Sequence, residues 1–64
     1  MDRSEVYRTE SGMVFRVTRD GEGRLSVDVM KAGDWEAGRI GMVGLRHAQG
    51  TKRLTQQQVD RLIG

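Results

Sequence analysis

The stretch MVFRVTRDGEGRLSVDVM, residues 13–30, decides the fold, because apolar and polar residues alternate on both sides of a glycine-rich turn. A period of two is typical of strands that bury one face and leave the other in solvent. The sequence DGEG, residues 20–23, is typical of a hairpin connection. The stretch therefore predicts two antiparallel strands joined by a tight turn.

The length of the turn fixes the register of this hairpin. Opposed residues of an antiparallel pair share a face of the sheet, so Val17 must lie opposite another apolar residue. A three-residue loop places Val17 opposite Val27 and Phe15 opposite Val29, with Gly23 in the left-handed position of a bulged type I turn. The row expected to face the core is Phe15, Val17, Leu25, Val27 and Val29.

The same register sets charges of opposite sign across from one another. Arg16 lies opposite Asp28, and Asp20 lies opposite Arg24. Cross-strand pairs of this kind contribute roughly 0.2–1 kcal/mol each. The charges therefore agree with the register that the apolar residues require.

A further strand is expected before the hairpin, in the β-prone sequence EVYRT, residues 5–9. The sequence ESG turns it into the next strand, which gives a three-stranded meander over residues 5–30. A turn of two residues and a turn of three residues at this point would place different side chains of the first strand on the core face. The sequence therefore leaves open whether Val6 or Tyr7 faces the core.

The residues after the meander are more ambiguous. Val14 and Met30 fall on the outer face of the sheet, which indicates that this face is also partly covered. Trp35 lies between turn signals and is expected to be a core or interface anchor. Residues 40–45 predict a short, bent fourth strand, loosened by two glycines.

The sequence LTQQQVDRLIG predicts a C-terminal helix over residues 56–63. Thr55 is the expected N-cap, with Gln58 completing a capping box, and Leu54 and Val59 occupy the positions of a hydrophobic staple. The predicted fold class is α+β: a small twisted antiparallel sheet of three to four strands, β-β-β-(β)-α, with one C-terminal helix packed on one face. The helix side chains expected to contact the sheet are Val59, Leu62 and Ile63.

Length and composition limit the classes of protein that are plausible. The 64 residues are expected to form one domain, 1–64, and the chain has no cysteine for a disulfide, a thiolate zinc site or a nucleophile. One histidine does not build a metal site, so we expect neither a metal nor a cofactor. The sequence has no long apolar run and no secretory signal at its start, which predicts a cytoplasmic protein without membrane contact. So short a chain is expected to gain buried area as a homodimer.

No motif in the sequence predicts an enzyme. The sequence GLRHAQGTK, residues 44–52, departs from a phosphate-binding P-loop, which requires Gly-Lys-Ser/Thr at the start of a helix. His47 has no acidic residue near it in the sequence to orient it as a general base. Asp34 and Glu36 are spaced like paired carboxylates, but surface residues of a strand explain them equally well.

The uneven charge indicates a binding function. Residues 1–37 carry six Lys/Arg against eight Asp/Glu, a net charge of −2, whereas residues 38–64 carry five Lys/Arg against one Asp, a net charge of +4. We expect the glycine-rich basic segment, residues 38–53, and the first turn of the helix to bind nucleic acid, such as duplex DNA, through phosphates and adenine edges. The candidate nucleic-acid-binding residues are Arg39, Arg46, His47, Lys52, Arg53, Gln56 and Gln57.

Two alternatives remain open at this point. The basic segment is also compatible with a solvated connecting loop. The chain is equally compatible with a protein–protein interaction module, such as an inhibitor, an adaptor or a small assembly subunit, acting through a sheet edge or an exposed apolar patch. Salt distinguishes the classes, because phosphate contacts weaken steeply as salt rises and apolar contacts do not.

Overall fold

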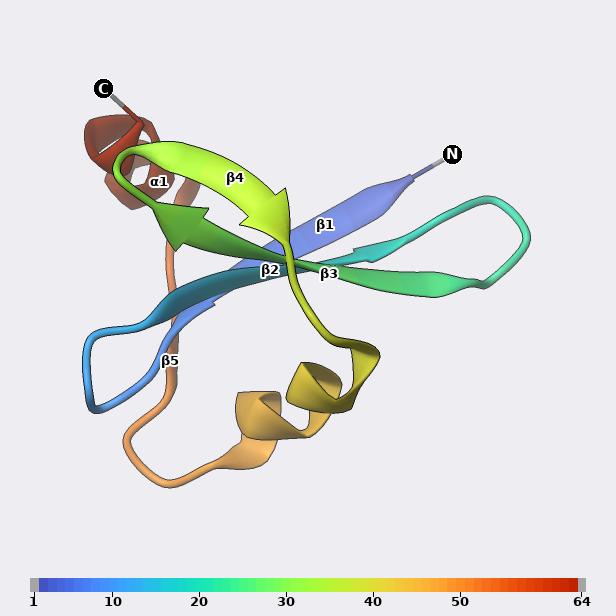
Figure 1. The fold of residues 1–64 in the computed structure, drawn as a ribbon, viewed down its shortest axis with the longest axis horizontal. Helices are drawn as coiled ribbons and strands as arrows, with labels where there is room; N and C mark the ends of the chain where they lie inside the picture. The colour runs from blue at the N-terminus through green and yellow to red at the C-terminus, as the bar shows by residue number, and fades with distance from the viewer. Residues whose placement is uncertain (1, 64) are drawn as a thin grey trace.

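A five-stranded antiparallel sheet forms the centre of the structure, a computed structural model that describes residues 2–63 (Figure 1). The fold class is α+β as predicted, but the sheet has more strands than the three or four expected. The strand order is β4-β3-β2-β1-β5. The elements are β1 (Arg3–Arg8), β2 (Val14–Arg19), β3 (Leu25–Lys31), β4 (Asp34–Ala37), the 3₁₀ helix η1 (Ile40–His47), β5 (Lys52–Arg53) and α1 (Gln56–Leu62).

The hairpin of β2 and β3 has the predicted register. Val17 lies opposite Val27 and Phe15 opposite Val29, and Gly23 adopts a φ of 83°. The predicted contact of Asp20 with the Arg24 side chain does not form. The Asp20 carboxylate instead accepts the backbone N–H of Arg24 at 2.9 Å, because it caps the turn.

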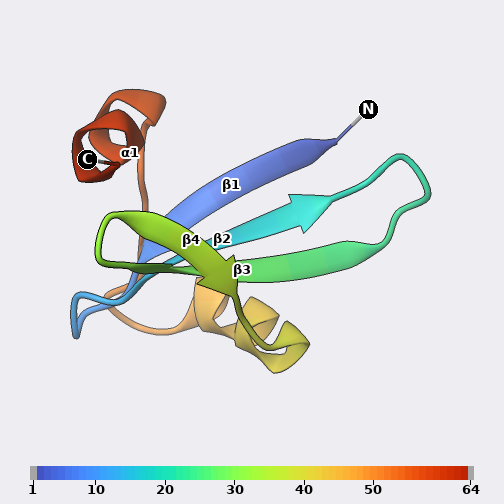
Figure 2. The ribbon, with the colours of Figure 1, turned by 45° about the horizontal axis from the view of Figure 1, so that its top comes forward.

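Both faces of the sheet are covered, each by a different helical segment (Figure 2). On the η1 face, Phe15 is fully buried and Tyr7 stacks on it, with 5.5 Å between ring centroids. On the α1 face, Val6 and Val14 pack with Leu54 and Val59. Val6 therefore faces α1 and Tyr7 faces η1. The sequence left open which of the two faces the core, and in the structure each packs on a covered face of the sheet.

The strand predicted over residues 40–45 is wrong, because these residues belong to the 3₁₀ helix η1. Met42 and Leu45 are spaced by one turn of such a helix, and both pack against the η1 face with Val43. The fourth strand is β4, which follows a two-residue turn, with positive φ at both residues, between β3 and β4. Trp35 lies on this strand opposite Met30, where it packs against the α1-side core.

The helix α1 has the predicted start but a smaller contact with the sheet. The Thr55 hydroxyl accepts the N–H of Gln58 at 3.2 Å, and the Gln58 side chain accepts the N–H of Thr55 at 2.8 Å, which completes the capping box. Val59 is buried, but Leu62 and Ile63 are 39% and 45% exposed. The expectation that all three apolar residues pack against the sheet is therefore wrong, and α1 ends at Leu62, one residue earlier than predicted.

Candidate functional site

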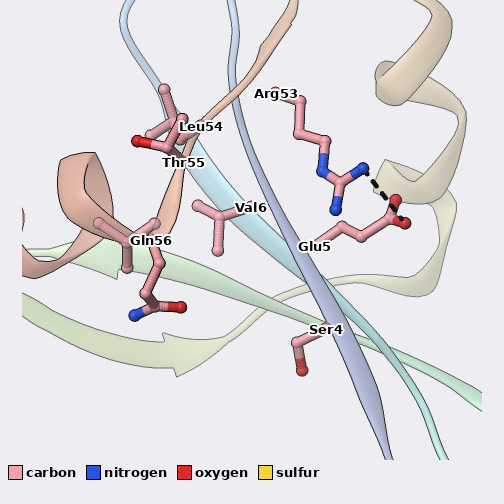
Figure 3. A pocket seen from close by; sticks show the side chains of 8 residues that line it. Ser4, Glu5, Val6, Arg53, Leu54, Thr55 and Gln56 are labelled. Carbon is pink, nitrogen blue, oxygen red and sulfur yellow. Dashed lines mark ion pairs between the residues drawn. The ribbon is translucent and has the colours of Figure 1, made fainter.

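The structure divides the residues predicted to bind nucleic acid between the two sides of the sheet. The side chain of Arg53 lies on the η1 side of β1 together with Glu5, whereas Gln56 lies on the α1 side (Figure 3). Lys52 precedes Arg53 on β5, so its side chain points to the opposite face. The predicted residues thus do not form one continuous surface.

The other predicted residues lie along η1 and in the first turn of α1. Arg39 precedes η1 and is exposed, and His47 is exposed at its end. Gln56 donates its amide to Asp60 at 2.9 Å, and Gln57 is exposed next to it. None of these four contributes to the group of side chains around Arg53.

Arg46 and Arg53 both lie near Glu5. The Nη1 atom of Arg53 lies 3.9 Å from Oε1 of Glu5, and both side chains are partly exposed. Arg46 is fixed by its own helix, because its Nε atom donates to the carbonyl oxygen of Val43 at 3.1 Å. Two predicted residues that are seven positions apart in the sequence therefore act on the same carboxylate.

The structure adds two arginines that the sequence analysis did not single out. Arg3 at the start of β1 lies directly opposite Arg19 at the end of β2. Both side chains line one hollow on the η1 face with Arg46, and Glu5 and Val17 form its remaining walls. We call Arg3, Arg19, Arg46 and Arg53 the arginine cluster.

The arginine cluster carries a local excess of positive charge. It holds four guanidinium groups and the single carboxylate of Glu5, a local net charge of +3, and the charges of Arg3, Arg46 and Arg53 act on that carboxylate. Arg3, Arg19 and Arg46 make no ion pair with any other residue between 2 and 63. Arginines placed directly opposite one another in a sheet destabilise it. The cluster is therefore a site that favours a bound anion.

Glu5 is held in its ionised form by its neighbours. The hydroxyl of Tyr7 donates to the Glu5 carboxylate and lowers its pKa below the usual 4.5, and Arg53, Arg46 and Arg3 lower the pKa further against the opposing effect of burial. Burial of the ring raises the pKa of Tyr7 above 10.0, and the hydrogen bond to Glu5 and the negative charge of Glu5 raise it further. At neutral pH the site therefore holds one carboxylate and a neutral phenol among four cations.

The apolar patch proposed for protein binding is smaller than the sequence suggested. Val14 is buried, and Met30 and Met42 are half-buried against the two covers of the sheet. Among residues 2–63, the large apolar side chains that remain exposed are Ile40, Leu62 and Ile63. Ile40 lies on η1 and the other two lie at the end of α1, so these side chains are contributed by two separate segments.

Other kinds of site find no support in the part of the chain that the structure describes. No group of three or more His, Cys, Asp or Glu side chains there is arranged to hold a metal ion. No helix in that part is long and apolar enough to cross a membrane. The chain matches no protein-family model, and no curated protein and no solved structure matches it either.

Proposed function

We propose that this protein is a non-catalytic module that binds nucleic acid, and that the arginine cluster contacts the phosphate backbone. The observation that carries the proposal is the pair of Arg3 and Arg19, which lie directly opposite one another and share a hollow with Arg46. Guanidinium groups bind phosphate oxygens with two parallel hydrogen bonds, which suits them to this ligand.

The position of the arginines supports contact with a polymer rather than with one small anion. Arg3 lies on β1, Arg19 on β2, Arg46 on η1 and Arg53 on β5, so four different elements contribute charge to one face. The Arg53 side chain is 67% exposed, and its Nη1 atom lies beside the Glu5 carboxylate, which lines the hollow. Phosphates that follow one another along a backbone match this arrangement better than a single anion does.

The position of Glu5 favours a nucleic-acid backbone over a small anion as the ligand of the arginine cluster. A carboxylate inside a cationic site repels any anion that approaches it directly, and this lowers affinity for small anions at its centre. A phosphate backbone avoids Glu5 by contacting the arginines on either side of it. The proposed contacts are therefore positioning contacts to phosphate, which carry no base specificity of their own.

The test compares two triple variants with the same loss of charge. The first changes Arg3, Arg19 and Arg53 to Gln; all three side chains are exposed, so the fold should tolerate the change. The control changes three exposed arginines outside the cluster, Arg8, Arg24 and Arg61, to Gln. Binding to a labelled mixed-sequence DNA duplex is followed by fluorescence anisotropy from low to physiological salt, and circular dichroism checks that each variant is folded.

The proposal predicts that the cluster variant loses duplex binding while the control variant retains most of it. Each lost phosphate contact should reduce the slope of log affinity against log salt by about 0.9, so the cluster variant should lose about 2.7. Equal losses in the two variants would mean that binding follows net charge alone. That result, or no binding of the wild-type protein at low salt, would overturn the proposed site.

A further inference from the structure

The outer edge of β1 is covered over only part of its length. β5 pairs with Tyr7 and Arg8, and the N–H of Leu54 donates to the carbonyl oxygen of Val6 at 2.8 Å. The chain then leaves the sheet and enters α1. Residues 3–5 therefore have β2 on one side and no strand from the described part of the chain on the other.

The backbone groups of Ser4 point toward this uncovered edge. The carbonyl oxygen of Val6 points away from β2, since it accepts from Leu54, and residues two apart in a strand direct their N–H and C=O groups to the same side. The N–H and C=O of Ser4 therefore face away from β2, toward the uncovered edge of β1. The side chain of Ser4 is drawn in Figure 3. The residues that line the space beside this edge come from β1, from β5 and from the start of α1, and they include Ser4, Glu5, Arg53 and Gln56.

We infer that a second copy of this chain pairs with the uncovered edge, β1 against β1, around a two-fold axis that passes beside Ser4. In this register the N–H and C=O of Ser4 bond the C=O and N–H of the partner's Ser4. Arg3 then lies opposite the partner's Glu5, and Glu5 lies opposite the partner's Arg3. Two-fold symmetry repeats each contact, so the pairing contains two backbone hydrogen bonds and two pairs of opposite charge.

Charge complementarity favours β1 over the other two edges of the sheet. A symmetric pairing of β4 around Trp35 sets Asp34 opposite the partner's Glu36, which brings carboxylates together. Both residues of β5, Lys52 and Arg53, are cationic, so this edge also repels its own copy. Natural sheets protect their edges with such charges. In β1, by contrast, the charges at positions 3 and 5 have opposite signs.

The geometry limits how much of β1 takes part. Leu54 occupies the place beside Val6, so a partner strand fits against residues 3–5 and must leave the sheet at its own Asp2. A ladder of three residues buries little surface compared with a stable dimer. The dimer is therefore weak and reversible, and it forms with increasing protein concentration.

Pairing around an axis perpendicular to the sheet keeps the same face of both copies on one side. The arginine clusters of the two copies then form one surface with twice the local charge, +6 in place of +3. This consequence for binding rests on the proposed function. The dimer itself does not, because it depends on the sheet edge alone.

Sedimentation equilibrium over a concentration series tests the inference without any nucleic acid. The wild-type mass should rise from 7.2 kDa toward twice that value. Ser4→Pro removes the N–H that faces the edge and leaves the ladder to β2 intact, so it should abolish the rise. Ser4→Ala is the matched control: it removes the hydroxyl that bonds Thr18 at 2.9 Å but keeps the N–H, and it should still dimerise.

Charge exchange tests the register. Arg3→Glu alone and Glu5→Arg alone each place like charges opposite one another twice, and each should weaken dimerisation about tenfold or more. The double variant Arg3→Glu/Glu5→Arg restores opposite charges and should restore the dimer. Circular dichroism confirms that each variant is folded.

Three results would overturn the inference: a monomer at every concentration, a dimer that survives Ser4→Pro, or a double variant as weak as the single ones. A monomer that still binds duplex DNA would reject the dimer and leave the proposed function standing. A dimer that does not bind DNA would reject the proposed function and leave the dimer standing.

Discussion

Replacement of Arg19 by Gln should stabilise the protein and weaken its binding to nucleic acid at the same time. Arg19 lies directly opposite Arg3 in the β1–β2 ladder, and neither makes an ion pair with another residue in the range 2–63. The two positive charges therefore repel one another in the folded state. Gln keeps a similar length and removes one of these charges.

The size of the gain follows from the position of the two residues. Like charges directly opposite in a sheet cost roughly 0.2–1 kcal/mol, and both side chains are exposed, so screening places this pair near 0.2–0.5 kcal/mol. In a domain of this size, such a gain raises the melting temperature by about 1–4 °C. The gain should disappear at about 1 M salt, where the Debye length falls to about 3 Å.

Thermal melts at low and high salt measure the stability, and anisotropy with a duplex measures the binding. Arg24→Gln is the control, because Arg24 is exposed at the hairpin tip and pairs loosely with Glu22 at 3.6 Å. Arg19→Gln should also reduce the salt slope of binding by about 0.9. A lower melting temperature at low salt would refute the repulsion, and an unchanged salt slope would refute the phosphate contact.

Three further predictions concern the parts that hold this site in place. Gly38→Ala should destabilise the protein by about 1–3 kcal/mol in urea unfolding, because its new Cβ would lie 2.9 Å from a valine methyl carbon, whereas Gly41→Ala meets nothing within 4 Å and should not. Thr55→Ala should cost about 1 kcal/mol by removing one half of the capping box, and an unchanged urea midpoint would contradict the cap. Tyr7→Phe should destabilise the protein at neutral pH, and this loss should shrink below pH 4.5, because the lowered pKa of Glu5 contributes stability that disappears as that carboxylate is protonated. Above pH 10.0 the wild-type protein should lose stability as Tyr7 ionises, because its pKa is raised in the folded state, and Tyr7→Phe should not show this loss. If stability changes with pH in the same way for the wild type and for Tyr7→Phe, both effects are contradicted.

Local patterns made part of the fold predictable from the sequence. The hairpin register follows from the requirement that Val17 meet an apolar residue, and the helix start follows from Thr55 and Gln58, three positions apart. The residues of η1 fit two local structures, because the spacing of Met42 and Leu45 suits one 3₁₀ turn while the glycines around them also suit a bent strand. β5 has only two residues, both charged, and carries no hydrophobic pattern at all.

The candidate site was predictable only in part, because distant residues build it. Arg46 and Arg53 belong to the basic segment that the charge distribution indicates. Arg3 and Arg19 lie in the half of the chain with net negative charge, and they meet only when β1 pairs with β2 in its observed register. The turn length between these strands does not follow from the sequence, so no local signal places the two arginines together.

The two helical segments that pack on the faces of the sheet, η1 and α1, come from one continuous stretch of chain. This stretch is synthesised after the strands that it covers. η1 and α1 both lie after Gly38, whereas the four strands that they cover are finished at Ala37. During synthesis the N-terminal residues emerge first, so the meander leaves the ribosome before the segment that covers its two faces. Burial of Phe15 on one side and of Val14 on the other therefore waits for the same late segment. A chain cut after Ala37 would lose both covers together, and a separate peptide carrying the remainder would restore both or neither.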